Sequence, residues 1–161
     1  MSLRVILLDS NPVTEIPPQV GLLTKLRELN LENVTTLRNP PQSVRSRGLQ
    51  AIQKYLSSFC SAKDTSELTL SNYNLDHMLV PVTKNLQHIV SLNMPGNRLS
   101  YLGPSIVRFC NIKKINLADN AIEYFPSELL CLGTLEELDL SFNQGLGISI
   151  SSVVSYVREM Q

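Results

Sequence analysis

The sequence predicts an α/β fold in which short parallel strands stack into a right-handed solenoid, with a helical segment in the middle. Two observations carry this prediction. One pattern, Leu-x-x-Leu-x-Leu-x-x-Asn-x-Leu, can be found six times along the 161 residues. Between the second and third copies, the apolar residues change to the spacing of a helix. A pattern that recurs at a fixed period is typical of solenoids, whose repeats bury their apolar faces against one another.

The copies are evenly spaced at both ends of the chain. The starts at 89, 112 and 135 are each 23 residues apart, and so are the starts at 3 and 26. Each copy predicts one strand, and we expect all strands to be parallel. The first positions of the six copies are Leu3, Leu26, Thr65, Ile89, Ile112 and Leu135. The strands are predicted near residues 5–8, 28–31, 67–70, 91–94, 114–117 and 137–140, and the third, which begins with Thr65, is the weakest.

Side chains alternate along each predicted strand. In the copy that begins at Ile112, we expect Ile115 and Leu117 to point into the core, while Lys114 and Asn116 point outward. The asparagine of the pattern follows the strand, where its amide can bond the backbone of its own turn and of the adjacent repeat. We therefore expect a structural ladder of asparagines rather than a catalytic group. Its members are Asn11, Asn97, Asn120 and Asn143.

These motifs resemble the leucine-rich-repeat family, and the resemblance extends over most of the chain. Two 23-residue copies end in Ile16-Pro17-x-x-Val20-x-x-Leu23 and Phe125-Pro126-x-x-Leu129-x-x-Leu132. In this they are similar to the cytosolic class found in Ras-suppressor, Scribble-like and Roco proteins. The resemblance implies a chain that binds other proteins.

The array is interrupted after the second copy. From Leu26 to Thr65 is 39 residues, which is 16 more than one 23-residue repeat needs. The sequence Asn39-Pro40-Pro41 disfavours helix or sheet locally, and the following apolar residues predict a helix over about 44–59. Those residues are Leu49, Ile52, Leu56 and Phe59. We favour a helical cap on the first array, with a loop insertion in one continuous horseshoe as the alternative.

This organisation predicts three parts. Residues 1–59 form two repeats and the helical cap, 60–64 form a linker of small and polar residues, and 65–161 form a second array of four repeats with a C-terminal helix near 149–159. Because a repeat opens at Leu3 without a polar cap, we expect the first repeat to present an apolar edge that calls for a neighbour.

Composition excludes several kinds of partner. Lys plus Arg and Asp plus Glu both number 14, so no charge excess favours nucleic acid. No apolar run is long enough for membrane insertion. The three cysteines lack paired spacing, which favours a reducing, cytoplasmic location. No nucleophile motif, metal-ligand spacing or phosphate-binding loop is present, so we expect no cofactor, no metal and no enzymatic activity.

Acidic residues gather in the last repeat, at Glu136, Glu137 and Asp139. The register places them beside Lys113 and Lys114 of the preceding repeat. We interpret this cluster as an ion-paired ladder rather than an active site, since exposed pairs of this kind contribute only about 0–1 kcal/mol each.

The outward strand positions are the candidates for partner binding. They lie on the concave face of the predicted solenoid, where the sheet holds them at fixed spacing. The candidates are Ser91, Asn93, Lys114, Asn116, Glu137, Asp139 and Phe142. Phe142 is either an aromatic anchor on this face or a residue stacked inside the loops of its own repeat.

The sequence therefore predicts a non-catalytic scaffold that binds another protein through its concave face. The alternative is a regulatory repeat segment of a larger signalling enzyme, a Roco-type GTPase or a kinase, whose catalytic domain lies outside these residues. An extracellular receptor repeat would need a signal peptide and paired cap cysteines.

Overall fold

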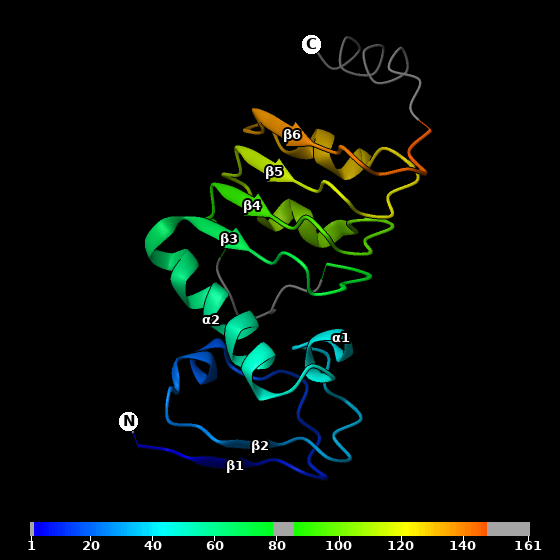
Figure 1. The fold of residues 1–161 in the computed structure, drawn as a ribbon. Coiled ribbons are helices and arrows are strands. Elements are labelled where there is room, and N and C mark those ends of the chain that lie inside the picture. The colour runs from blue at the N-terminus through cyan, green and yellow to red at the C-terminus, as the bar shows by residue number, and fades with distance from the viewer. Residues whose placement is uncertain (1, 79–85, 148–161) are drawn as a thin grey trace.

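The computed structural model describes residues 2–78 and 86–147, and these form two parallel sheets joined by a helix (Figure 1). The first sheet pairs β1 (Val5–Leu7) with β2 (Glu28–Asn30). The second has the order β3 (Glu67–Thr69), β4 (Ser91–Asn93), β5 (Lys114–Asn116) and β6 (Glu137–Asp139). Every pair of neighbours is parallel. The predicted α/β solenoid is confirmed, including its weakest strand, at 67–69.

The register of the second sheet follows from the repeat. Leu92 pairs with Ile115, and Ile115 pairs with Leu138, so that inward positions of successive copies stack on each other. Leu92, Ile115 and Leu117 are fully buried. Lys114, by contrast, is exposed, as the alternation of a strand requires.

In three of the repeats, the chain that leads from one strand to the next forms a short 3-10 helix on the side away from the strands. These helices are η1 (Pro18–Leu22), η2 (Pro104–Arg108) and η3 (Ser127–Cys131). A proline stands at the start of η1 and η2 and just before η3, where its missing N–H costs nothing. Ile106 of η2 and Leu129 of η3 are buried and close the core on this side.

The middle segment folds into two helices, α1 (Gln42–Arg45) and α2 (Leu49–Thr65). A helix was expected over 44–59, and the structure differs at both ends. Gly48, at φ +85°, separates the two helices, and α2 continues through residues 60–64, which we expected to form a linker. That expectation is wrong because Ala62 extends the apolar stripe of the helix by one turn and is itself buried.

The helix α2 interrupts the sheet. Its packing partners are η1 in the first array and β3 in the second, and the described residues contain no ladder between β2 and β3. Its buried residues are Ile52, Tyr55, Leu56, Phe59 and Ala62. They join one hydrophobic cluster that runs from Ile16 to Leu132, so the core is continuous where the sheet is not.

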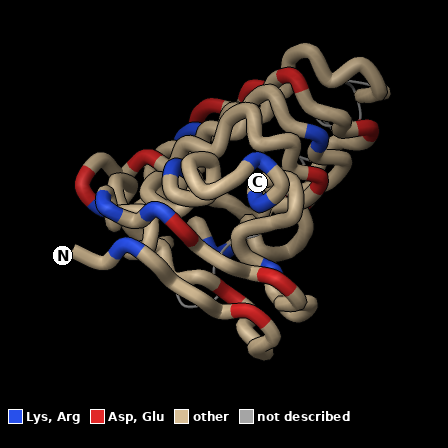
Figure 2. The backbone as a smooth tube through the Cα atoms, turned by 60° about the horizontal axis from the view of Figure 1, so that its bottom comes forward, with Lys and Arg blue, Asp and Glu red and all other residues tan. Residues whose placement is uncertain are grey.

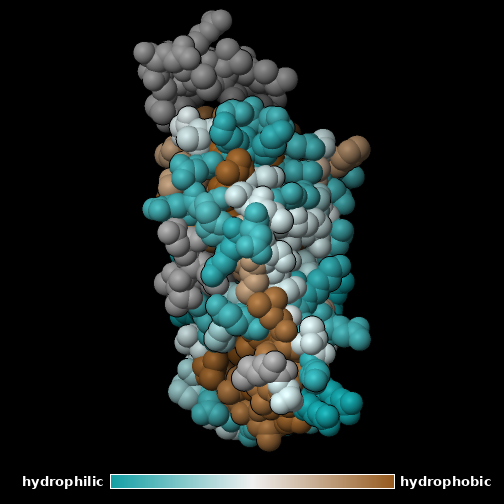
Figure 3. Space-filling view, turned by 90° about the vertical axis from the view of Figure 1, so that its left-hand side faces the viewer, coloured by the Kyte–Doolittle hydropathy of each residue, from teal (hydrophilic) through white to brown (hydrophobic). Residues whose placement is uncertain are grey.

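The first repeat presents apolar side chains to solvent. Leu3, Val5 and Leu7 are 37%, 45% and 59% exposed. Hydrophobic surface gathers at the end of the molecule that carries β1 and β2 (Figure 3). The helix expected near 149–159 lies outside the described residues.

Candidate binding surface on the strand face

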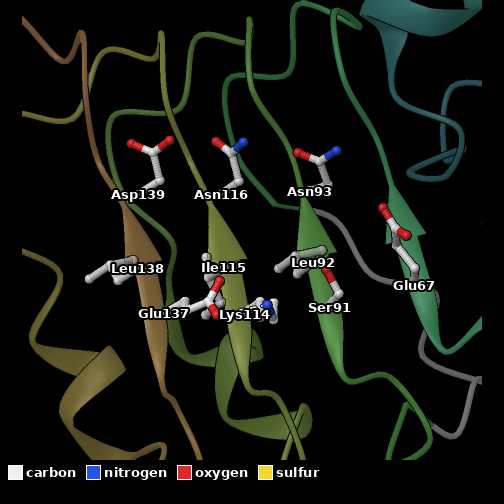
Figure 4. Close-up of a pocket in the computed structure, with 10 residues that line it drawn as sticks. All are labelled: Glu67, Ser91, Leu92, Asn93, Lys114, Ile115, Asn116, Glu137, Leu138 and Asp139. Atoms are coloured by element: carbon white, nitrogen blue, oxygen red, sulfur yellow. Dashed lines mark hydrogen bonds and ion pairs between the residues drawn. The ribbon is translucent and has the colours of Figure 1, made fainter.

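The outward side chains of β3 to β6 line one shallow hollow, which we call the strand face (Figure 4). Its volume is about 450 Å³. It brings together six of the seven candidate residues, and Glu67, an outward residue of the weak third repeat that was not among the candidates, lines it as well. The polar lining residues are Glu67, Ser91, Asn93, Lys114, Asn116, Glu137 and Asp139.

Register places opposite charges side by side on this face. Lys114 lies opposite Glu137, and its Nζ is 2.7 Å from the Glu137 carboxylate. Hydrogen bonding to Glu137 raises the pKa of Lys114 above its usual value. One position earlier, Lys113 and Glu136 form a second pair at 2.6 Å, outside the hollow. The predicted ion-paired ladder is present.

The second row of the strand face consists of two amides and a carboxylate. Asn116 Oδ1 accepts the Ala118 N–H, and Asp139 Oδ1 accepts the Ser141 N–H, each at 2.9 Å. The side-chain hydrogen bond from Ser141 and this backbone bond lower the pKa of Asp139. In both repeats the outward side chain thus binds the backbone two residues further on.

Asn93, the third member of this row, departs from the rule. The residue two positions later is Pro95, which has no N–H to donate. Asn93 Oδ1 is buried and has no hydrogen-bond partner among the described residues. An unpaired buried acceptor of this kind costs about 1–3 kcal/mol, so a donor supplied by a ligand would be favoured here. The signal was readable in the sequence as Asn93-Met94-Pro95.

Phe142 lies apart from the hollow. It occupies the turn after β6 with φ +59° and is 79% exposed, so it does not stack inside the loops of its repeat. It does not line the hollow, but it stands in solvent close to the last strand, where an aromatic side chain can contact a partner.

The asparagines of the repeat bond the backbone of neighbouring turns. Asn97 Oδ1 accepts the N–H groups of Tyr73 and Leu75, while its Nδ2 donates to the carbonyls of Leu70 and Met94. Asn120 and Asn143 make equivalent bonds one and two repeats later.

Asn11 differs because it belongs to the first repeat. Among the described residues, its Nδ2 donates to the carbonyls of Leu8 and Asp9, both within its own turn. At the corresponding place in the second and third repeats stand Val34 and Tyr73, whose side chains fill the core instead.

Electrostatics over the rest of the described backbone are mixed. Basic and acidic positions both occur along the backbone tube, interspersed among uncharged residues (Figure 2). Within residues 2–78 and 86–147, no group of three or more His, Cys, Asp or Glu could hold a metal ion. None of the helices in those same ranges combines the length and the apolar character needed to cross a bilayer.

No model of a protein family matches the chain. It is 35% identical over 117 residues to leucine-rich repeat and IQ domain-containing protein 4 of Homo sapiens, which covers 73% of this chain and 18% of that protein. The repeat, the parallel ladders and this similarity show that the chain belongs to the leucine-rich-repeat proteins.

A second relative is a volume-regulated anion channel subunit of Mus musculus, 29% identical over 143 residues, or 88% of this chain and 16% of the subunit. The chain thus spans less than a fifth of either relative. The solved structure of a leucine-rich-repeat protein of Leptospira interrogans covers 99% of this chain and 47% of its own, at 19% identity and a TM-score of 0.46.

Proposed function

We propose that this chain is a non-catalytic module that binds another protein through the strand face. The observation that carries the proposal is Asn93 Oδ1, a buried acceptor without a partner among the described residues, on a side chain that lines the hollow. A partner N–H that reaches this atom would satisfy it without displacing an existing hydrogen bond. The short strands hold the surrounding side chains at fixed spacing, so little ordering is needed on binding.

The charges on the strand face indicate which side chains a partner would present. Lys114 is paired with Glu137, which leaves Glu67 and Asp139 as carboxylates without a cation in the hollow. A partner segment that presents N–H donors and a lysine or arginine therefore complements this face. The finer assignments, a cytoplasmic scaffold with repeats of the cytosolic 23-residue class, are part of the same proposal.

One observation favours a second candidate, a regulatory segment of a larger signalling enzyme. Both relatives are more than five times as long as the part that this chain matches. A repeat segment of this size within a longer polypeptide would present the same strand face, either to a partner or to a catalytic domain of its own protein.

The test is affinity capture from cell extract with two matched charge swaps. Lys114→Glu with Glu137→Lys keeps the ion pair but inverts its polarity on the strand face, whereas Lys113→Glu with Glu136→Lys does the same outside the hollow. We expect the first swap to lose the partners of the native chain and the second to retain them, at equal thermal stability. Equal recovery by both would refute the assignment to the strand face.

A further inference from the structure

The outer edge of β3 is open. Toward β4, the N–H of Leu70 bonds the Asn93 carbonyl at 2.8 Å and the N–H of Asn72 bonds the Pro95 carbonyl at 3.0 Å. Because backbone groups alternate along a parallel strand, those of Glu67, Thr69 and Ser71 face the opposite edge. In a continuous solenoid that edge would meet the preceding strand, but β2 does not pair with β3.

At this edge, the backbone groups of Glu67 already have a hydrogen-bond partner in the chain. The hydroxyl of Thr65 accepts the Glu67 N–H and donates to the Glu67 carbonyl, each at 3.2 Å. The backbone N–H and carbonyl groups of Thr69 and Ser71 have no such partner in the described part of the chain. Two pairs of donors and acceptors, two residues apart, are therefore available at the edge.

A hollow of about 550 Å³ lies directly beside these groups, and we call it the edge groove. One wall carries Thr69 and Ser71, and the other carries Lys54 and Ser58 of α2, with Arg47 just before the helix. A second hollow, of about 290 Å³, shares Lys54, Ser58 and Thr69 and continues along α2 to Thr65. Their combined size suits a short extended segment, since ligand pockets commonly measure about 300–1,000 Å³.

The charge in the edge groove has one sign. Arg47 and Lys54 are the charged residues that line it, and no described lining residue of the groove is acidic, although Glu67 lines the second hollow. Arg47 is held in place, because its guanidinium donates to the Asn72 carbonyl at 2.6 Å and lies 5.8 Å from the centre of the Tyr73 ring. Its remaining N–H groups can bind a carboxylate.

We propose that the edge groove binds an extended peptide segment with acidic side chains. The backbone of the segment adds to the open edge of β3 through Thr69 and Ser71, as strands add to exposed sheet edges, while its carboxylates meet Arg47 and Lys54. This site lies at the outer edge of β3 and differs from the strand face in charge, although Glu67 lines both the strand face and the second hollow. The strand face favours a cationic segment, whereas the edge groove favours an anionic one.

The experiment uses a fluorescent peptide of alternating glutamate and threonine, titrated against the full chain. Two further peptides serve as comparisons: one of alternating lysine and threonine, and one glutamate-threonine peptide N-methylated at every residue, which has no backbone N–H donor on either edge. Amide hydrogen exchange then reports on Thr69 and Ser71, whose N–H groups are unbonded in the free chain. We expect binding of the first peptide alone, with slower exchange at both amides.

Two single variants of α2 distinguish an effect of charge in the edge groove from an effect of the overall charge of the helix. Lys54→Glu should weaken binding of the acidic peptide about tenfold through like-charge repulsion, whereas Lys63→Glu, an equal change of charge outside the edge groove, should leave it within about twofold. The Asn93→Ala variant, which alters the strand face, should bind the peptide normally, so the two proposed sites can fail independently.

Several outcomes overturn the proposal. Among them are no binding of the glutamate-threonine peptide, equal binding of its N-methylated form, and binding without protection of Thr69 and Ser71. An unchanged affinity in Lys54→Glu would do so as well. Competition by inorganic phosphate at equal potency would identify a simple anion site in place of a peptide site.

Discussion

The Tyr55 hydroxyl donates a hydrogen bond to Asn39 Oδ1 at 2.9 Å, in the buried junction between α2 and the first array. Tyr55 is fully buried, and its ring makes edge contacts with Phe59 and Tyr73, whose centres lie 5.4 and 5.3 Å away. This one side chain therefore connects the end of the first array, the helix and the third repeat.

Removal of that hydroxyl should destabilise the junction. In Tyr55→Phe the packing is kept, but Asn39 Oδ1 loses its donor in a buried site, at a cost of about 1–3 kcal/mol in the free energy of unfolding. Urea denaturation measures this loss. Tyr124→Phe, at a tyrosine that is 77% exposed, is the matched control and should change stability by less than about 0.5 kcal/mol.

Stability should also fall at high pH. Burial raises the pKa of Tyr55 in the folded chain, with smaller contributions from Tyr73 and Glu15, and burial raises that of Tyr73 as well. Above the unfolded tyrosine pKa of about 10, the unfolded chain releases protons that the folded chain retains, so its stability decreases as the pH rises further. Thermal melts between neutral pH and pH 11 should show this loss.

In Tyr55→Phe the slope of stability against pH should be shallower above pH 10, because the most strongly perturbed group is gone. A slope equal to that of the native chain would assign the effect to other tyrosines.

The two faces of β5 should respond very differently to truncation. Leu117, just after the strand, is fully buried, and Leu117→Ala should cost about 2–5 kcal/mol in the free energy of unfolding. Lys114→Ala removes only an exposed ion pair and should stay within about 0.5 kcal/mol. Similar losses in chemical denaturation would mean that the faces have been assigned in reverse.

Replacement of the ladder asparagines should reduce the free energy of unfolding by different amounts in different repeats. Asn97→Ala removes bonds to the backbone of two adjacent turns and leaves buried groups unpaired, for a loss of at least about 2 kcal/mol. Asn11→Ala removes only local bonds at an exposed turn, so its effect should be well under about 1 kcal/mol. Equal losses in the two variants would contradict a role in joining repeats.

The repeat determined most of the fold in advance. The six strands of the described residues lie within one residue of the predicted positions, because the period of two along a strand and the recurrence of the repeat, at 23 residues or at 24 between β3 and β4, fixed the register within each sheet. The extent of α2 was harder to predict. Residues 60–64 are small or polar and so resemble a linker in composition, and only the burial of Ala62 shows that the apolar stripe of the helix continues.

The positions that line the hollow were predictable from the sequence, whereas their chemistry was predictable only in part. Outward positions of the strands followed from alternation, including the pairing of Lys114 with Glu137. The unpaired Asn93 Oδ1 could be read from Pro95, two residues later in the same repeat. The open edge at Thr69 depends on a preceding strand that does not pair with β3, which the pattern of a single repeat does not reveal.

Site-specific photo-crosslinking tests the central claim most directly. A photoreactive side chain replaces Asn116 on the strand face in one variant and Val107 of η2, which is 47% exposed on the opposite side, in another. After irradiation in cell extract, we expect covalent adducts with a partner protein from position 116 and none of that size from position 107. Adducts that form from position 107 and not from position 116 would contradict binding through the strand face.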